Sequence, residues 1–250
     1  MRSEDMARLT AEINRPVIRI LPYIDTAGLW LPYTPRCSRT DIEAEYGRRV
    51  RIEECKWGYR VPLHQPSKQI LPVLDDLQRE HRAVLSWLDI AVDLTTRTST
   101  DADRLKDWLV RRLSLLWCRS RCVRIVTNRR TGATTIYFDW ENKHRNLAIY
   151  SDRPSKLTGE PCCHIELRLR GAQTCRRNDL QFASYDLLEL DPRWLFDKHV
   201  RLLGSDAFVG APVEVADGPK YRIEILDRRL QRIDAVPLSA AQGSDMASPP

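Results

Sequence analysis

The chain has 250 residues, 42% of them hydrophobic, which is enough for one large domain or two small ones with a packed core. Lysine and arginine number 40 against 34 acidic residues, giving a formal net charge of +6 and a pI near 9.0. Arginine far outnumbers lysine, and its planar guanidinium suits paired hydrogen bonds to phosphate. The composition therefore favours a polyanionic partner, although a basic protein without one would carry the same charge.

Several classes of protein are disfavoured by what the sequence lacks. It has no apolar run of about 18 residues, the length of a membrane-spanning helix, and its N-terminus lacks the apolar region of a signal peptide. Seven cysteines without regular spacing fit a reducing compartment. The glycine-rich patterns of nucleoside triphosphatases and dinucleotide-binding proteins are absent. We expect a cytoplasmic bacterial protein with no membrane partner.

The first third of the chain predicts a strand, a hairpin and a helix. Residues 1–15 suit a short or frayed helix, and Val17–Tyr33 combines β-branched and aromatic residues with prolines, which predicts a bent strand. Val50–Pro66 predicts a hairpin with a turn or bulge near Gly58. Leucines at helical spacing predict a helix over residues 71–77.

The central part predicts most of a sheet and one amphipathic helix. A strand is expected over about 84–94, and a helix follows with N-cap candidates at 99–101 and apolar positions from 105 to 116. A hairpin with the turn sequence NRRTG comes next. Two further strands contain Tyr150 and Glu166, and the turn-rich loop DRPSKLTGEP joins them.

The C-terminal third shows helical patterns that break near Asp191 and end near Gly204, then a strand or hairpin and a short helix. Because the strands cluster without βαβ alternation, we predict an α+β fold in which helices back an antiparallel sheet. We expect a main domain over residues 1–175, a helical extension packed on it over 176–235, and a disordered tail over 236–250.

Two aspartates share one face of the strand LSWLDIAVDLTT, because residues i, i+2 and i+4 of a strand point the same way. Asp89 and Asp93 lie in an otherwise apolar segment, where carboxylates need a cation or a metal. Their oxygens suit Mg²⁺ or Mn²⁺. The alternative is that one aspartate caps a loop and the other pairs with an arginine.

Tyr150 ends the string RNLAIY. A tyrosine can attack a phosphodiester and form a covalent phosphotyrosine. Its phenol, with an ordinary pKa of about 10, then needs activation by a metal, a base or nearby cations. His144, Arg145, Arg153 and Lys156 are close enough in sequence to contribute. The alternative is a tyrosine packed at a sheet edge, since tyrosine is common in strands.

In the string CHIELRLRG, His164, Glu166 and Arg168 share a face. Glu166 could be a third metal ligand or an arginine partner, and His164 could bind metal through its neutral imidazole. A solvated face with alternating charges explains the string as well. A zinc site is not predicted, because the cysteines beside His164 match no structural zinc spacing.

Basic residues recur beside aromatic ones, a combination that can follow a nucleic-acid backbone while bases stack. The candidates for contacts to DNA are Arg129, Arg130, Arg145, Lys156, Arg168 and Arg170. The first two would project from the NRRTG turn, and a solvated hairpin tip is the alternative reading of that turn.

Taken in order, WLDIAVD, LAIYSDRPSK and CHIELRLRG resemble the core motifs of rolling-circle replication initiation proteins of plasmids and phages. GATTIYFDW and the early PYIDTAGLWLP resemble two further strands of that family, so the similarity extends over about residues 17–175. It is greatest to the group in which acids replace the usual histidine metal ligands, and this chain has no H-x-H pair.

The resemblance implies an HUH-endonuclease or RRM-like palm, an antiparallel sheet that binds an origin hairpin or single-stranded DNA. Tyr150 would be the nucleophile that nicks one strand and stays attached to the 5′ phosphate. Mg²⁺ or Mn²⁺ would be held by Asp89, Asp93 and Glu166, and phosphate by Arg168 or Arg170. A host helicase and a second copy of the chain are the further partners expected.

Two alternatives stay open at this point. The chain could be a DNA-binding protein on the same scaffold without nicking activity, since Ser151, Asp152 and Arg153 follow Tyr150 where the family has an early lysine. It could also be an α+β protein with no nucleic-acid role.

Overall fold

The computed structural model describes residues 17–32, 52–55, 58–66, 83–116, 122–178, 180, 187, 189–203, 208–229 and 235–237. The first fifteen residues and the helix predicted over 71–77 lie outside the described residues, as does the predicted tail beyond residue 237.

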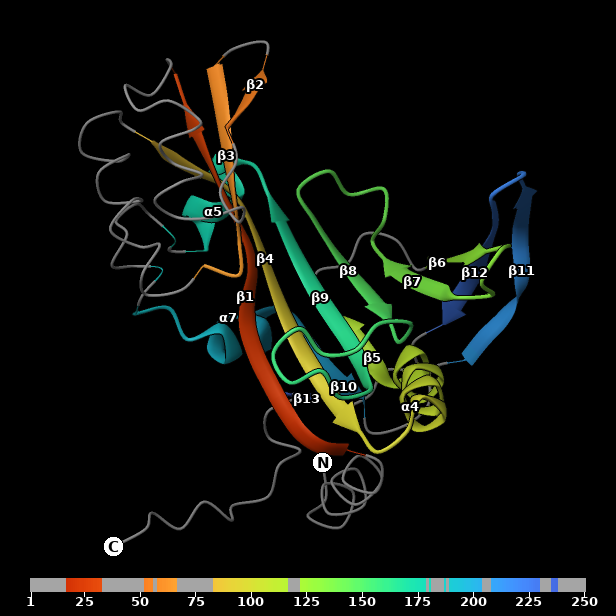
Figure 1. The fold of residues 1–250 in the computed structure, drawn as a ribbon. Helices are drawn as coiled ribbons and strands as arrows, with labels where there is room; N and C mark the ends of the chain where they lie inside the picture. The colour runs from red at the N-terminus through yellow and green to blue at the C-terminus, as the bar shows by residue number, and fades with distance from the viewer. Residues whose placement is uncertain are drawn as a thin grey trace, which may run out of the picture.

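A ten-stranded antiparallel sheet forms the body of the molecule, in the order β11-β12-β6-β7-β8-β9-β4-β1-β3-β2 (Figure 1). Its strands are β1 (Val17–Leu31), β2 (Glu53–Cys55), β3 (Gly58–His64), β4 (Val84–Thr96), β6 (Cys122–Asn128), β7 (Thr134–Phe138), β8 (Arg145–Tyr150), β9 (Cys162–Arg170), β11 (Phe208–Asp217) and β12 (Tyr221–Arg229). A second sheet has the order β13-β10-β5 and consists of β5 (Leu113–Leu115), β10 (Val200–Leu203) and β13 (Ala235–Pro237).

Three helices are described beside the sheets: α4 (Ser99–Arg112), α5 (Ala172–Arg177) and α7 (Pro192–His199). Helix α4 begins one residue after Thr98, whose hydroxyl accepts a hydrogen bond from the Asp101 amide at 3.1 Å. Helix α7 begins with proline after Asp191, the break that the sequence predicts. None of the described helices is long and apolar enough to cross a membrane.

The apolar core lies on one side of the main sheet, because alternate residues of its central strands are apolar. Ile90 of β4 stands opposite Leu167 of β9, and both are fully buried. Leu109 of α4 and Phe196 of α7 belong to the same buried cluster. In Figure 1 the β8–β9 loop crosses in front of β1 and β4, whereas α7 and β10 lie behind these strands. The other face of the sheet is therefore left to polar residues.

The predicted C-terminal helical extension is not seen in the described residues. Helix α7 ends at His199 and the chain continues directly as β10, while β11 and β12 form a hairpin that joins the main sheet through β6. The segment YRIEIL alternates polar and apolar residues with period two, which fits a half-buried strand and not a helix. The predicted domain boundaries themselves stay a prediction.

Leu167 offers a direct test of the core. We expect Leu167→Ala to lower the free energy of unfolding by about 2–5 kcal/mol, because the site is enclosed by strands on both sides and cannot collapse easily. Urea denaturation measures this change. Leu157→Ala, in a loop where the side chain is 51% exposed, should change the value by less than about 0.5 kcal/mol. Equal losses for the two variants would contradict the assignment of the core.

A buried histidine ties the end of α7 to the sheet. His199 Nε2 lies 2.8 Å from Asn178 Oδ1, and Nδ1 lies 3.2 Å from an Arg145 guanidinium nitrogen. Burial lowers the pKa of His199 to about 4, and the positive charges of Arg145, Lys198 and Arg201 act in the same direction. The imidazole is therefore neutral in the folded protein at neutral pH.

This histidine should make the protein less stable in mild acid. Unfolding returns the imidazole to its ordinary pKa of about 6.5, so the unfolded state binds more protons between pH 6.5 and 4. We expect stability to fall across that window, by at most about 1.4 kcal/mol per pH unit from this group. Urea midpoints between pH 7.5 and 4.5 should fall less steeply for His199→Gln. A variant at the exposed His144, His144→Gln, should keep the wild-type slope.

Candidate functional site on the polar sheet face

The polar face is created by the pairing of β4 with β9 and of β9 with β8. Directly opposed residues of antiparallel strands point to the same side. The opposed pairs are Asp89–Arg168, Ala91–Glu166, Asp93–His164 and His164–Tyr150. The structure thus places the predicted nucleophile and the three predicted metal ligands on one surface.

Tyr150 is held between Glu166 and His164. Its hydroxyl lies 3.4 Å from Glu166 Oε2, and its ring stacks on the His164 imidazole with 4.7 Å between centroids and 24° between planes. Burial raises the pKa of the phenol, the negative charges of Glu166 and Asp25 raise it further, and Arg168 with Arg153 opposes them. The hydroxyl therefore keeps its proton and donates it in a hydrogen bond to Glu166.

Two of the predicted metal ligands are paired with arginines. Arg168 donates from Nε and Nη2 to the two oxygens of Glu166, at 2.8 and 3.1 Å. Arg170 binds both oxygens of Asp89, which also accepts a 2.7 Å hydrogen bond from the Trp87 indole. Each carboxylate of these pairs is therefore already compensated by a cation.

The two carboxylates differ in whether burial or the neighbouring arginine determines the direction of the pKa shift. Burial alone would raise the pKa of Glu166, but the hydrogen bonds and charge of Arg168 outweigh it and hold the pKa below its ordinary value. At Asp89, burial dominates and raises the pKa despite Arg170. Glu166 is consequently ionised at neutral pH and can accept a proton or a hydrogen bond.

Asp93 has a different set of partners. His164 Nδ1 lies 2.7 Å from Asp93 Oδ1, the Ser155 hydroxyl donates to Oδ2 at 2.6 Å, and the Tyr23 hydroxyl donates to Oδ1 at 3.3 Å. On the other side of the imidazole, Cys162 Sγ lies 3.1 Å from His164 Nε2. The side chains of Asp93, Cys162 and His164 are buried.

The loop between β8 and β9 closes over this cluster. The backbone bridge between Pro154 and Pro161 shapes the loop, and the Arg153 carbonyl lies 3.0 Å from His164 Nε2. Lys156 reaches across to form an ion pair with Asp25 of β1. The loop thus shields Asp93 and His164 from solvent and leaves Tyr150 at its margin.

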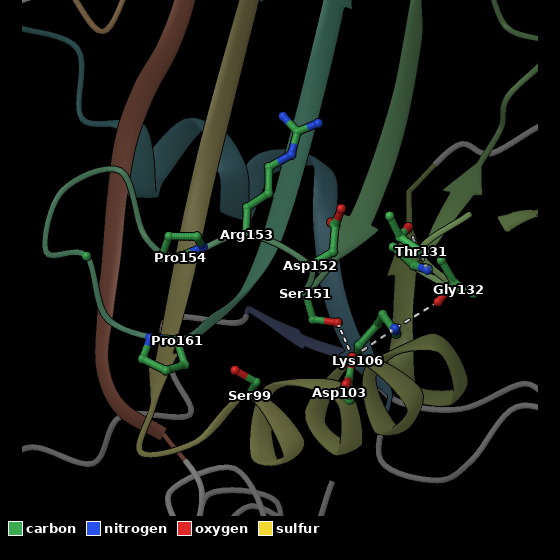
Figure 2. Close-up of a pocket in the computed structure, with 13 residues that line it drawn as sticks. Ser99, Asp103, Lys106, Thr131, Gly132, Ser151, Asp152, Arg153, Pro154 and Pro161 are labelled. Carbon is green, nitrogen blue, oxygen red and sulfur yellow. Dashed lines mark hydrogen bonds and ion pairs between the residues drawn. The ribbon is translucent and has the colours of Figure 1, made fainter. Parts of the chain in front are cut away.

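A pocket of about 390 Å³ opens beside the same loop, between α4 and the β6–β7 turn (Figure 2). Ser151 donates a 2.5 Å hydrogen bond to Asp103, and the buried Lys106 ammonium contacts Asp103 at 3.2 Å and the Thr134 hydroxyl at 2.8 Å. Figure 2 shows Arg153 pointing away from α4. Hydroxyls and a lysine line the pocket, and one lining residue, Ser151, directly follows Tyr150 in the sequence.

The predicted DNA-binding residues are spread over several places. Arg168 and Arg170 lie on the polar face next to Tyr150, with guanidiniums over the rings of Tyr137 and Trp87. The remaining four lie elsewhere. Arg129 is paired with Asp217 at 2.6 Å, Arg130 is exposed in the β6–β7 turn, Arg145 is largely buried near His199, and Lys156 is paired with Asp25.

The geometry gives a first test of the expected Mg²⁺ or Mn²⁺ site. Asp89 and Glu166 are each paired with an arginine. In the described part of the chain, one group of possible metal ligands has its ligand atoms within 4.8 Å of one another, and neither carboxylate belongs to it. That group is Asp93, Cys162 and His164. The arrangement therefore does not fit a hard cation bound by three carboxylates, and that ligand set stays a prediction.

Sequence reasoning named His164, set the neighbouring cysteine aside as a zinc ligand, and missed Tyr23 and Ser155. The i, i+2 spacing of Cys162 and His164 in a strand could have revealed that they share a face. Tyr23 and Ser155 gave no comparable signal, because their contacts with Asp93 depend on β1 pairing and on the path of the loop.

Comparison with known proteins gives a likeness of fold. No protein-family model matches the sequence, and no curated protein is similar enough to count as a relative. Among solved structures, the chain is similar to a rolling circle replication initiator protein from Geobacillus stearothermophilus, with a TM-score of 0.44 and 12% sequence identity. The match covers 74% of this chain and 87% of that one.

The loop over Asp93 should loosen when its serine is removed. Ser155 Oγ accepts hydrogen bonds from the Leu157 and Thr158 amides and donates to Asp93, so Ser155→Ala leaves a buried carboxylate short of one donor. We expect a stability loss of about 1–3 kcal/mol. Hydrogen exchange of the two amides should quicken at the same time. Thr158→Ala, at an exposed position of the same loop, should leave both readouts near wild type.

Proposed function

We propose that this chain is a replication initiation protein that binds an origin and nicks and rejoins single-stranded DNA through Tyr150. The observation that carries the proposal is the Tyr150 hydroxyl, 3.4 Å from a Glu166 oxygen on a sheet face that also presents Arg168. A nucleophile, a proton acceptor and a cation suited to phosphate thus occur together.

In the proposed nicking step, Tyr150 Oη attacks the phosphorus of a DNA phosphodiester. The phenolic proton passes to Glu166, which already accepts its hydrogen bond. The bond between phosphorus and O3′ breaks, and the leaving oxygen takes a proton from water to become a 3′ hydroxyl. The 5′ phosphate stays on Tyr150. Rejoining is the reverse, in which the 3′ hydroxyl attacks the phosphotyrosine and the tyrosine regains its proton.

A base is needed during the attack because Tyr150 holds its proton in the resting protein. Burial and the charges of Glu166 and Asp25 raise the pKa of the phenol, so phenolate is not available beforehand. A positioned general base contributes typically about 10²–10⁴-fold to such a reaction. The positive charge of Arg168 opposes the rise in the pKa of Tyr150 and lowers the pKa of Glu166. The same charge would stabilise the phosphate as negative charge develops on it.

The surroundings suggest a path for the DNA strand. Arg168 and Arg170 keep side chains that are 27% and 31% exposed, so they can meet phosphate at the site. Arg130, exposed at the β6–β7 turn, would contact a phosphate farther along. Arg145 is less suited, because its side chain is only 11% exposed.

The metal and the further partners in this proposal come from the sequence resemblance. Mg²⁺ or Mn²⁺ is the expected cofactor. Because arginines already engage the carboxylates of Asp89 and Glu166, the step proposed above uses Tyr150 and Glu166 without a metal. An origin hairpin, a host helicase and a second copy of the chain remain proposed partners.

One observation favours a second function, that of a DNA-binding protein without nicking activity. Two of the three acids predicted to bind a metal, Asp89 and Glu166, are paired with arginines. Arginines on such a face could bind a DNA backbone without any reaction.

Tyr150→Phe separates the two functions. The protein is incubated with single-stranded hairpin oligonucleotides and Mn²⁺, or with a chelator, and a denaturing gel shows whether DNA becomes covalently attached. We expect an adduct with the wild type and none with Tyr150→Phe, because the substitution removes only the attacking oxygen. Tyr221→Phe, at an exposed tyrosine of β12, should retain the adduct.

An adduct that survives in Tyr150→Phe would place the nucleophile elsewhere, with Tyr137 and Tyr185 next in line. Salt-sensitive DNA binding without an adduct from any oligonucleotide would favour the second function. Absence of DNA affinity at low salt would exclude both.

A further inference from the structure

A thiol, an imidazole and a carboxylate meet in the interior at the margin of the polar face. Cys162 and His164 lie two residues apart on β9, and Asp93 stands opposite His164 on β4. Their ligand atoms lie within 4.8 Å of one another, and all three residues are buried. We propose that Asp93, Cys162 and His164 bind a transition-metal ion of the Zn²⁺ class.

The spacing of the donor atoms suits a tetrahedral ion. Bonds of about 2.0–2.3 Å from zinc to nitrogen, oxygen and sulfur place neighbouring ligand atoms about 3.3–3.6 Å apart. Cys162 Sγ is 3.1 Å from His164 Nε2, and the Arg153 carbonyl is 3.0 Å from that nitrogen and 3.6 Å from the sulfur. This carbonyl is the fourth donor within reach. Asp93 Oδ1 faces the other ring nitrogen, Nδ1, at 2.7 Å, so the imidazole or the carboxylate must turn before both bind one ion.

The donor chemistry selects the ion. Thiolate and imidazole are ligands of Zn²⁺ and its neighbours, whereas Mg²⁺ prefers oxygen and retains water. Among the three predicted acidic ligands, Asp93 is the one whose nearest partners are a histidine and two hydroxyls and not an arginine. A cation between Asp93, His164 and Cys162 would therefore have no arginine to displace.

Binding would release the thiol proton. Burial, followed by the negative charge of Asp93, raises the pKa of Cys162 to about 12, so the sulfur is protonated without a metal. A coordinated ion replaces that proton, and the sulfur becomes a thiolate ligand. Metal affinity should consequently increase with pH.

An ion at this position would affect more of the structure than its own ligands. It would join β4, β9 and the β8–β9 loop, three segments that now meet through hydrogen bonds. It would also fix the imidazole on which the Tyr150 ring stacks. The inference does not rest on DNA nicking, because ion binding is measured without DNA.

Co²⁺ titration of the metal-free full chain tests the proposal. Co²⁺ takes zinc sites and gives a near-ultraviolet thiolate charge-transfer band with visible bands typical of tetrahedral geometry. We expect both to saturate at one ion per chain, to vanish when Zn²⁺ is added, and to persist in excess Mg²⁺. The melting temperature should rise with Zn²⁺.

Cys162→Ser should abolish the thiolate band and the thermal shift, while Cys55→Ser, at a distant half-exposed cysteine, should retain both. If Cys162→Ser does not fold, the wild-type titration still decides. A wild type without a thiolate band overturns the proposal and leaves the cluster as a hydrogen-bonded Asp–His–Cys network. A band that persists in folded Cys162→Ser overturns it as well, because another cysteine then binds the ion.

Discussion

The antiparallel pairing of β4 with β9 is the constraint on which the rest of the structure depends. Its register sets Asp93 opposite His164 on one side of the sheet and Ile90 opposite Leu167 on the other. Because side chains alternate along a strand, a slip by one residue would turn the carboxylates into the apolar core. The cost of burying charge without a partner therefore holds the register, and the register brings Asp89 and Asp93 beside the β9 residues that contact the candidate nucleophile.

Charge compensation divides the polar face into two parts. In one part, Asp89 and Glu166 are held by Arg170 and Arg168, whose outward sides can meet phosphate. In the other, Asp93 is satisfied by an imidazole and hydroxyls beneath the β8–β9 loop. The first part offers anion recognition and a proton acceptor, and the second offers cation ligands. The candidate nucleophile lies between the two and touches a member of each.

The C-terminal region illustrates how local patterns can mislead. Helix α7 starts where Asp191 and a following proline predict, since capping is a local interaction. The next residues form β10 and not further helix, because β5 and β13 offer backbone hydrogen bonds there. The hairpin of β11 and β12 likewise depends on the exposed edge of β6, which no local pattern reveals.

The sequence by itself determined the antiparallel α+β class and which residues could share a face, because alternation along a strand is a property of the backbone. It placed Asp89 with Asp93 on one strand face, and Glu166 with His164 and Arg168 on another, without specifying their partners. Tertiary structure alone decided those partners: arginines for two of the acids, and a histidine, a cysteine and a loop serine around Asp93. Such contacts join residues as far as 81 positions apart, so they follow from strand register and loop path and not from local sequence.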